Sequence, residues 1–108
     1  MTPPEEKKLT LIVRVESGCL GPNGADVVDD FCCKAHQEFE SLYSGFITWR
    51  IESRDDKAKP EMDYYIANKR LDNVKAAKYL TLFDQSLAEV EMAAEDKLAG
   101  LINGYLGY

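Results

Sequence analysis

A strict alternation of side chains occupies residues 9–16, LTLIVRVE. Apolar residues recur at every second position, namely Leu9, Leu11, Val13 and Val15, and the positions between them hold Thr10, Ile12, Arg14 and Glu16. Successive side chains of a strand point to opposite faces of its sheet, so the pattern predicts a half-buried β-strand. The stretch that follows, GCLGPNG at 18–24, is dense in turn-forming residues and ends this strand.

An amphipathic helix is predicted over residues 24–43. Its apolar residues fall in one sector of a helical wheel and comprise Val28, Phe31, Cys32, Ala35, Phe39 and Leu42. We expect Asn23 to cap its start, with Asp26 closing a weak form of the capping box. Gly45 is expected to end the helix in the left-handed conformation.

Two further strands are predicted by alternation at 46–54 and 62–69, joined by the charged loop 55–60 as an antiparallel pair. The chain is then helical from Asp72 onward, with Ser86 as a second candidate cap. Nothing between Asp72 and Ala99 is Gly or Pro. The sequence therefore leaves open whether residues 72–106 form one helix or two.

The order of these elements predicts an α+β fold of the type β-α-β-β-α(-α). A strand–helix–strand crossover makes the first two strands parallel, and the third could return between them. The expected result is a three-stranded, mainly antiparallel sheet of order 1-3-2 with the helices on one face. This is the split βαβ arrangement of ferredoxin-like folds without its last strand. The missing strand would leave the first strand with an open edge, which favours a homodimer.

The composition predicts one globular domain over residues 9–108, preceded by a flexible tail at residues 1–8. The net charge is −6, and only residues 50–83 carry more Lys and Arg than Asp and Glu. Repulsion from phosphates then disfavours nucleic acids and anionic membranes as partners. Three cysteines without a spaced framework, and no apolar leader, indicate a cytoplasmic protein.

One candidate site is the sheet face that the helices leave uncovered. Alternation places on it Arg14, Phe46, Thr48, Arg50 and Tyr65, beside the apolar Ile12. Guanidinium and aromatic groups on an uncovered sheet are suited to binding a ligand or a partner. We interpret this cluster as an interaction surface.

A second candidate lies along one flank of the predicted helix. Spacings of three and four residues align Asp29, Cys33, His36 and Glu40 there, and Cys19 could approach from the preceding loop. Such side chains could coordinate a divalent metal, or His36 could activate the Cys33 thiol as a nucleophile. The absence of Cys-x-x-Cys and His-x-x-x-His spacing argues against both, and a solvated helix surface is the alternative.

No cofactor is predicted, and no sequence signature identifies an enzyme. The favoured hypothesis is a small non-enzymatic cytoplasmic module that dimerises through its open sheet and binds a small molecule or a protein partner. The alternative is a small metal- or thiol-dependent protein centred on Cys33 and His36.

Overall fold

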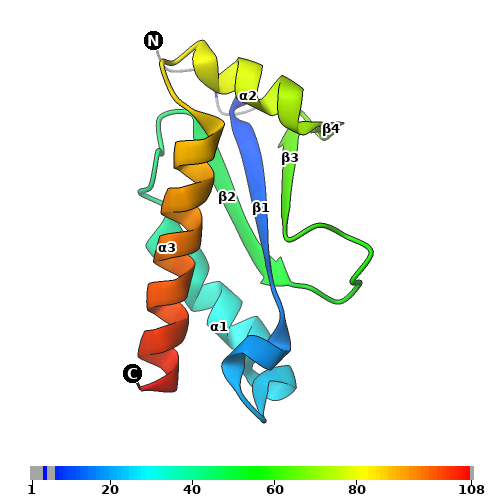
Figure 1. Cartoon of the computed structure of the whole chain (residues 1–108), viewed down its shortest axis with the longest axis vertical. Helices are drawn as coiled ribbons and strands as arrows, with labels where there is room; N and C mark the ends of the chain where they lie inside the picture. Colours follow the sequence, from blue (N-terminus) through cyan, green and yellow to red (C-terminus); the bar gives the residue numbers. More distant parts are fainter. Residues whose placement is uncertain (1–3, 5–6, 108) are drawn as a thin grey trace.

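The computed structural model describes residue 4 and residues 7–107. They form an α+β fold with one mixed sheet and three α-helices, which confirms the predicted class (Figure 1). In chain order the elements are β1 (Leu9–Val15), the 3₁₀ helix η2 (Ser17–Leu20), α1 (Gly24–Phe39), β2 (Ile47–Ser53), β3 (Met62–Ile66), β4 (Lys69–Leu71), α2 (Asn73–Thr81) and α3 (Leu87–Leu106). Most of the predicted flexible tail lies outside the described residues.

Strand β1 lies inside the sheet, whose order is β2-β1-β3-β4. It pairs in parallel with β2, from Leu9 opposite Ile47 to Val15 opposite Ser53, and antiparallel with β3 on its other side. The predicted order 1-3-2 is therefore wrong, and with it the ferredoxin-like arrangement and the open edge of the first strand. Inserting β3 would break the β1–β2 ladder, which spans both strands in full. Instead, residues 54–61 are long enough to cross the end of β1, a step of about 10 Å.

A fourth strand replaces the end of the third strand predicted from the sequence. Ala67 and Asn68 both adopt positive φ, 51° and 68°, and reverse the chain between β3 and β4. Two central residues with positive φ form the tight turn that suits the twist of a hairpin. The predicted three-stranded sheet is thus wrong by one short strand, and the hairpin is β3–β4 and not β2–β3.

Helices α1 and α3 pack on one face of the sheet, and α2 lies across its end (Figure 1). The core between them contains mainly aliphatic and aromatic residues: Leu9, Leu11, Val13, Val15, Ile47, Trp49 and Ile51 from the sheet, Val28, Phe31, Ala35 and Phe39 from α1, and Ala76, Leu80, Leu87, Val90 and Ala94 from α2 and α3. Tyr64 joins this core and donates its hydroxyl to the Glu91 carboxylate on α3. Removing this apolar surface from water is the main force that holds the helices on the sheet.

The C-terminal segment consists of two helices, which settles the open question. The Asp72 carboxylate accepts from the Lys75 N–H at 2.8 Å, and the Ser86 hydroxyl accepts from the Glu89 N–H at 3.5 Å, as their capping roles require. Between the helices, Asp84 adopts a φ of 57°. This left-handed residue changes the chain direction without Gly or Pro.

The expected N-cap of the first long helix is correct in position only, and its expected C-terminal end is wrong. Asn23 is the N-cap residue, but its side chain makes no capping hydrogen bond. The helix ends at Phe39 and not at Tyr43, because the residues after Glu40 form turns in which Tyr43 has a φ of 50°. Gly45 does not adopt positive φ. The Trp49 indole donates to the Leu42 carbonyl at 2.6 Å and fixes this turn against the sheet.

The glycine-rich turn after β1 serves a close approach of the backbone. A Cβ added at Gly24 would lie 1.7 Å from the Ser17 carbonyl oxygen, so only glycine fits there. Gly21 adopts a φ of 90°, which also favours glycine. The turn thereby places the start of α1 directly against η2.

No helix in the described part of the chain is long and apolar enough to cross a membrane.

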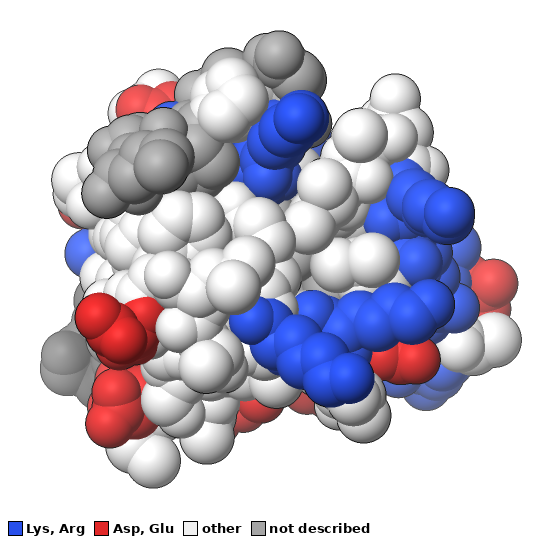
Figure 2. Space-filling model, turned by 90° about the horizontal axis from the view of Figure 1, so that it is seen from above, with Lys and Arg blue, Asp and Glu red and all other residues white. Residues whose placement is uncertain are grey.

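Charge is distributed unevenly over the surface. Viewed from the end that carries α2, Lys and Arg side chains gather on one half of the molecule (Figure 2). The exposed basic residues of β4 and α2 are Lys69, Arg70, Lys75 and Lys78.

Candidate functional site

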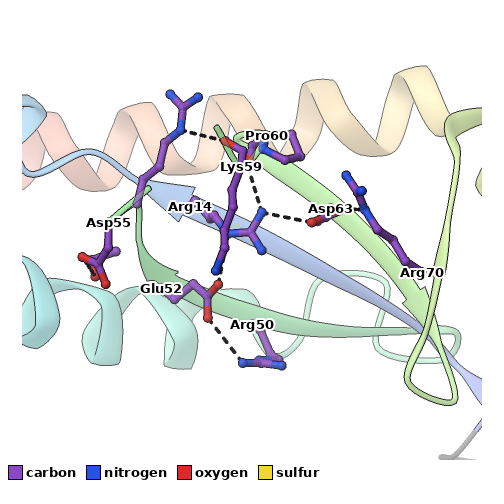
Figure 3. Close-up of polar contacts among 10 residues, drawn as sticks. Arg14, Arg50, Glu52, Asp55, Lys59, Pro60, Asp63 and Arg70 are labelled. Carbon is purple, nitrogen blue, oxygen red and sulfur yellow. Dashed lines mark hydrogen bonds and ion pairs between the residues drawn. The ribbon is translucent and has the colours of Figure 1, made fainter. Parts of the chain in front are cut away.

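The sheet face opposite α1 and α3, called the open face below, is formed by alternate residues of three strands. β1 contributes Thr10, Ile12 and Arg14, β2 contributes Thr48, Arg50 and Glu52, and β3 contributes Asp63 and Tyr65. The strand register sets Ile12 between Arg50 and Asp63, and Arg14 beside Glu52. Figure 3 looks onto this face, with the two long helices behind the strands.

A shallow hollow of about 510 Å³ occupies the open face. It is lined by Thr10, Ile12, Arg14, Thr48, Arg50, Glu52, Lys59, Tyr65 and Asn68. Ile12 forms an apolar floor and is only 4% exposed, because the long side chains around it exclude water. The rest of the lining is polar or charged.

Arg14 is the centre of the polar contacts on this face, although its side chain is only 6% exposed (Figure 3). Its Nε lies 3.1 Å from Glu52 Oε1, and its Nη1 lies 3.1 Å from Asp63 Oδ2. The same Nη1 donates to the Pro60 carbonyl at 2.9 Å. A buried guanidinium is tolerated when charged and polar acceptors surround it, and this one is held by acceptors from β2, from β3 and from the loop between them.

The Asp63 carboxylate joins two arginines. Its Oδ1 accepts from Arg70 Nε at 2.8 Å, while Oδ2 faces Arg14. Burial of this carboxylate acts to raise its pKa, but the hydrogen bonds from Arg70 and Arg14 outweigh burial, so the pKa lies below the ordinary value of 3.8. Asp63 is therefore a charged residue at neutral pH, and it fixes Arg14 in one position.

The loop between β2 and β3 is held over the edge of the open face by Arg54. This guanidinium donates to the carbonyls of Lys57 and Lys59 at 3.0 and 3.1 Å and pairs with Glu16 at 2.5 Å. These contacts bring Lys59 and Pro60 back toward Arg14 (Figure 3). The loop thus supplies a cation and a carbonyl to a site that is otherwise built on strands.

The hollow is electropositive within an acidic chain. Its charged lining residues are Arg14, Arg50 and Lys59 against Glu52 alone, in a chain whose net charge is −6. Arg50 is exposed and lies 3.3 Å from Glu52, so part of its charge is already balanced. Arg14 is paired with Asp63 as well as with Glu52, so the remaining excess of positive charge comes from Lys59 and Arg50 at the rim, and its local field attracts anions.

Four of the five residues predicted for this face lie together in the hollow: Arg14, Thr48, Arg50 and Tyr65. Phe46 does not. Its ring stacks on Phe83, with centroids 5.5 Å apart and planes within 7°, and it also contacts Tyr43. Phe46 precedes the first residue of β2, so the alternation of that strand does not extend to it. Sequence reasoning missed Asp63 and Lys59, which depend on strand pairing and on the path of the loop.

The second predicted cluster lies elsewhere, between α1 and the outer edge of β2. Asp29, Cys33, His36 and Glu40 line a groove of about 530 Å³ there, together with Cys32, Gln37, Ile51, Glu52 and Ser53. Cys19 belongs to η2 and does not line it. The nearest pairing within the cluster is His36 Nε2 with Glu40 Oε1, at 3.4 Å. Among the described residues no three His, Cys, Asp or Glu side chains are arranged to hold a metal ion.

The three cysteines are free thiols, and they differ in their surroundings. Cys19 and Cys33 are exposed, whereas Cys32 is buried in the core. Burial, assisted by the nearby Asp29 carboxylate, raises the pKa of the Cys32 thiol to about 11. A thiol with so high a pKa is a poor nucleophile at neutral pH.

Comparisons with known proteins add no family to this picture. No protein-family model matches the chain, and neither a curated protein nor a solved structure matches it.

Proposed function

We propose that this domain is a non-enzymatic binding module and that the hollow of its open face binds a small anionic molecule, such as a phosphate or a carboxylate. The observation that carries the proposal is the buried guanidinium of Arg14, fixed by Glu52, Asp63 and the Pro60 carbonyl at the edge of an electropositive hollow.

Arg14 has donors to spare for a ligand. A guanidinium carries five N–H donors, and the contacts of Arg14 within the protein use its Nε and Nη1. Its Nη2 takes part in none of them. Because the side chain is already immobile, binding an anion would cost little additional side-chain entropy. Planar guanidinium groups also match the geometry of phosphate and carboxylate oxygens.

The other lining residues complete a site for an anion of modest size. Arg50 and Lys59 add exposed cations at its rim, while Thr10, Tyr65 and Asn68 add neutral hydrogen-bonding groups. Ile12 offers an apolar floor for a ligand's carbon skeleton. The arrangement of a few polar groups around an apolar surface is typical of small-molecule sites.

The negative charge of the whole chain would oppose this binding at long range. At low ionic strength the local field of the hollow and the repulsion from −6 charges compete, while salt screens both beyond about 8–10 Å. We therefore expect weak binding that depends on direct contacts with the arginines. The three free cysteines fit a reducing compartment such as the cytoplasm as the setting.

The test is a titration of the ¹⁵N-labelled protein with inorganic phosphate and, separately, with citrate, followed by amide chemical shifts. We expect shifts centred on Thr10, Arg14, Thr48, Arg50 and Tyr65 for at least one of the two anions. Arg50→Gln should weaken binding about tenfold, as expected for the loss of a charged hydrogen bond. Lys69→Gln is the matched control, because Lys69 is exposed on β4 and does not line the hollow.

Two outcomes of this titration would contradict the proposed anion site. If neither anion perturbs the open face, or if both substitutions weaken binding equally, the hollow is not an anion site. In that case the contacts of Arg14 serve only to hold the loop 54–61 on the sheet.

A further inference from the structure

The outer edge of the sheet at β2 is a second surface that the fold leaves available. In the part of the chain that the structure describes, β2 pairs with β1 alone and ends the sheet. Just before β2 the Phe46 carbonyl accepts from the Leu9 N–H, and just after it the Arg54 N–H donates to the Val15 carbonyl, so even-numbered backbone groups face β1. The N–H and C=O groups of Trp49, Ile51 and Ser53 therefore point away from β1, as in an edge strand. The edge is most accessible toward Ser53, since Ile51 is 9% exposed and Trp49 2%.

We infer that this edge binds the β2 strand of a second copy of the chain, antiparallel and about a two-fold axis at Ile51. The inference goes beyond the proposed anion site and does not depend on it. Outward-facing residues of two antiparallel strands must lie opposite one another to exchange both hydrogen bonds. With the axis at Ile51, that residue faces its own counterpart and Trp49 faces Ser53 of the second copy.

Charge on the open face selects this register. With the axis at Ile51, Arg50 lies opposite Glu52 of the second copy, and the symmetry makes this contact twice. An axis at Arg50 would oppose two arginines, and an axis at Glu52 would oppose two glutamates. An axis at Trp49 would set Arg50 opposite Thr48, with no opposite charge to meet. An axis at Ser53 would set Glu52 opposite Arg54, whose guanidinium is already bound by Glu16 and by two loop carbonyls. Opposite charges directly across a strand pair stabilise it and like charges destabilise it, so Ile51 is the favoured axis.

The surroundings of the edge leave room for the second copy around Ile51 and Ser53, whereas the start of β2 is covered by the turn before it, where the Ile47 N–H donates to the Tyr43 carbonyl. The groove of about 530 Å³ between α1 and β2 opens beside Ile51 and Ser53, where side chains of an added strand would point. On the other side, Arg50 and Glu52 already line the open-face hollow. Pairing through β2 would therefore set the hollows of two copies side by side and would bring the second Glu52 next to Arg50.

The first experiment measures the mass of the purified chain in solution by sedimentation equilibrium. We expect a dimer whose dissociation is resolved within the accessible concentration range. Arg50→Glu should raise the dissociation constant about tenfold or more, because two attractive pairs become repulsive. Lys69→Glu, the same charge reversal at the opposite edge of the sheet, should leave it unchanged. A strict monomer at about 1 mM, or a dimer indifferent to Arg50→Glu, would overturn the inference.

A second experiment reads the register directly. Arg50→Cys and Glu52→Cys chains, each also carrying Cys19→Ser and Cys33→Ser, are mixed and oxidised. Opposed residues that are not hydrogen-bonded lie about 4.5 Å apart between Cα atoms, which suits a disulfide. A mixed 50–52 disulfide supports the axis at Ile51, whereas a 50–50 disulfide in the Arg50→Cys chain alone overturns it. Circular dichroism checks that Glu52→Cys folds without its contact to Arg14, and if it does not, the Arg50→Glu measurement decides.

Discussion

The Arg14 guanidinium lies 3.1 Å from the Asp63 carboxylate, and both side chains are more than nine-tenths buried on the open face, which no helix of the described residues covers. Neighbouring side chains and the returning loop cover this pair in place of a helix. The pair combines a structural role, since it fastens the loop to the sheet, with a chemical one, since it holds a guanidinium at the edge of the hollow. The contribution of this pair to the free energy of unfolding can be measured separately from that of the exposed ion pairs nearby.

Removing Arg14 should destabilise the fold far more than removing an exposed arginine. Arg14→Met leaves Glu52 and the buried Asp63 each short of a partner, so we expect a loss of about 2–4 kcal/mol in the free energy of unfolding. Arg50→Met removes only a surface pair, whose loss should cost under about 1 kcal/mol. Urea denaturation measures both. Equal losses would show that the Arg14–Asp63 pair contributes no more than a surface contact, and Asp63→Asn added to Arg14→Met should recover part of the loss.

Stability should fall in acid in a way that depends on Asp63. Its pKa is lower in the folded protein than the ordinary value of 3.8, because the hydrogen bonds from Arg70 and Arg14 outweigh burial. The contribution is therefore complete above that value and is lost as the pH falls through the lower pKa of the folded state. Unfolding followed between pH 5 and about 2 should show a steeper decline for the parent than for Asp63→Asn. Parallel declines in the two proteins would contradict this assignment.

Thiol reactivity should divide the cysteines into two classes. Cys19 and Cys33 are exposed, whereas burial and the Asp29 carboxylate raise the pKa of Cys32 to about 11. An aromatic disulfide reagent at pH 8 should modify Cys19 and Cys33 promptly and Cys32 only at the rate of unfolding. The double variant Cys19→Ser/Cys33→Ser should then show no fast phase. A fast phase in that variant would mean that the helix opens locally around Cys32.

The glycine turn offers a matched pair of substitutions. Gly24→Ala brings a methyl group into the Ser17 carbonyl, 1.7 Å away, and should cost roughly 3 kcal/mol or more. Gly18→Ala meets nothing within 4 Å and should be neutral to within about 0.5 kcal/mol. Thermal unfolding compares the two. Similar melting temperatures would show that η2 and α1 move apart at little cost.

The sequence predicted the strands and helices better than their arrangement. The alternation of apolar and polar residues located the first three strands, because successive side chains of a strand point in turn to the buried and the open face of the sheet. The central place of β1 was also visible in principle: Ile12 and Arg14 are buried on the face opposite Leu11 and Val13, so this strand is covered on both sides. The order was nevertheless wrong because the path of residues 54–61 depends on the long-range contacts of Arg54 with Glu16 and of Arg14 with the Pro60 carbonyl, which no local pattern contains.

Local backbone conformation explains the other differences between the predicted and the observed turns. The turn at Ala67 and Asn68 needs positive φ at both residues, and alanine gives no signal for it. Tyr43, with a φ of 50°, likewise ends the turn after α1 where glycine was expected to act. On the open face, alternation brought Arg14, Thr48, Arg50 and Tyr65 together correctly. Lys59 and Asp63 could not be assigned without knowing which strands are neighbours.

The brevity of β4 limits how far copies of this chain can assemble. β4 has three residues, two of them the exposed cations Lys69 and Arg70. A short, like-charged border is a poor template for further strand addition. Two chains joined through β2 would present only such borders at both ends, so growth would stop at the pair instead of continuing into a fibre. Lengthening β4, or replacing its cations with threonine, would be expected to remove this terminator and permit open-ended polymerisation.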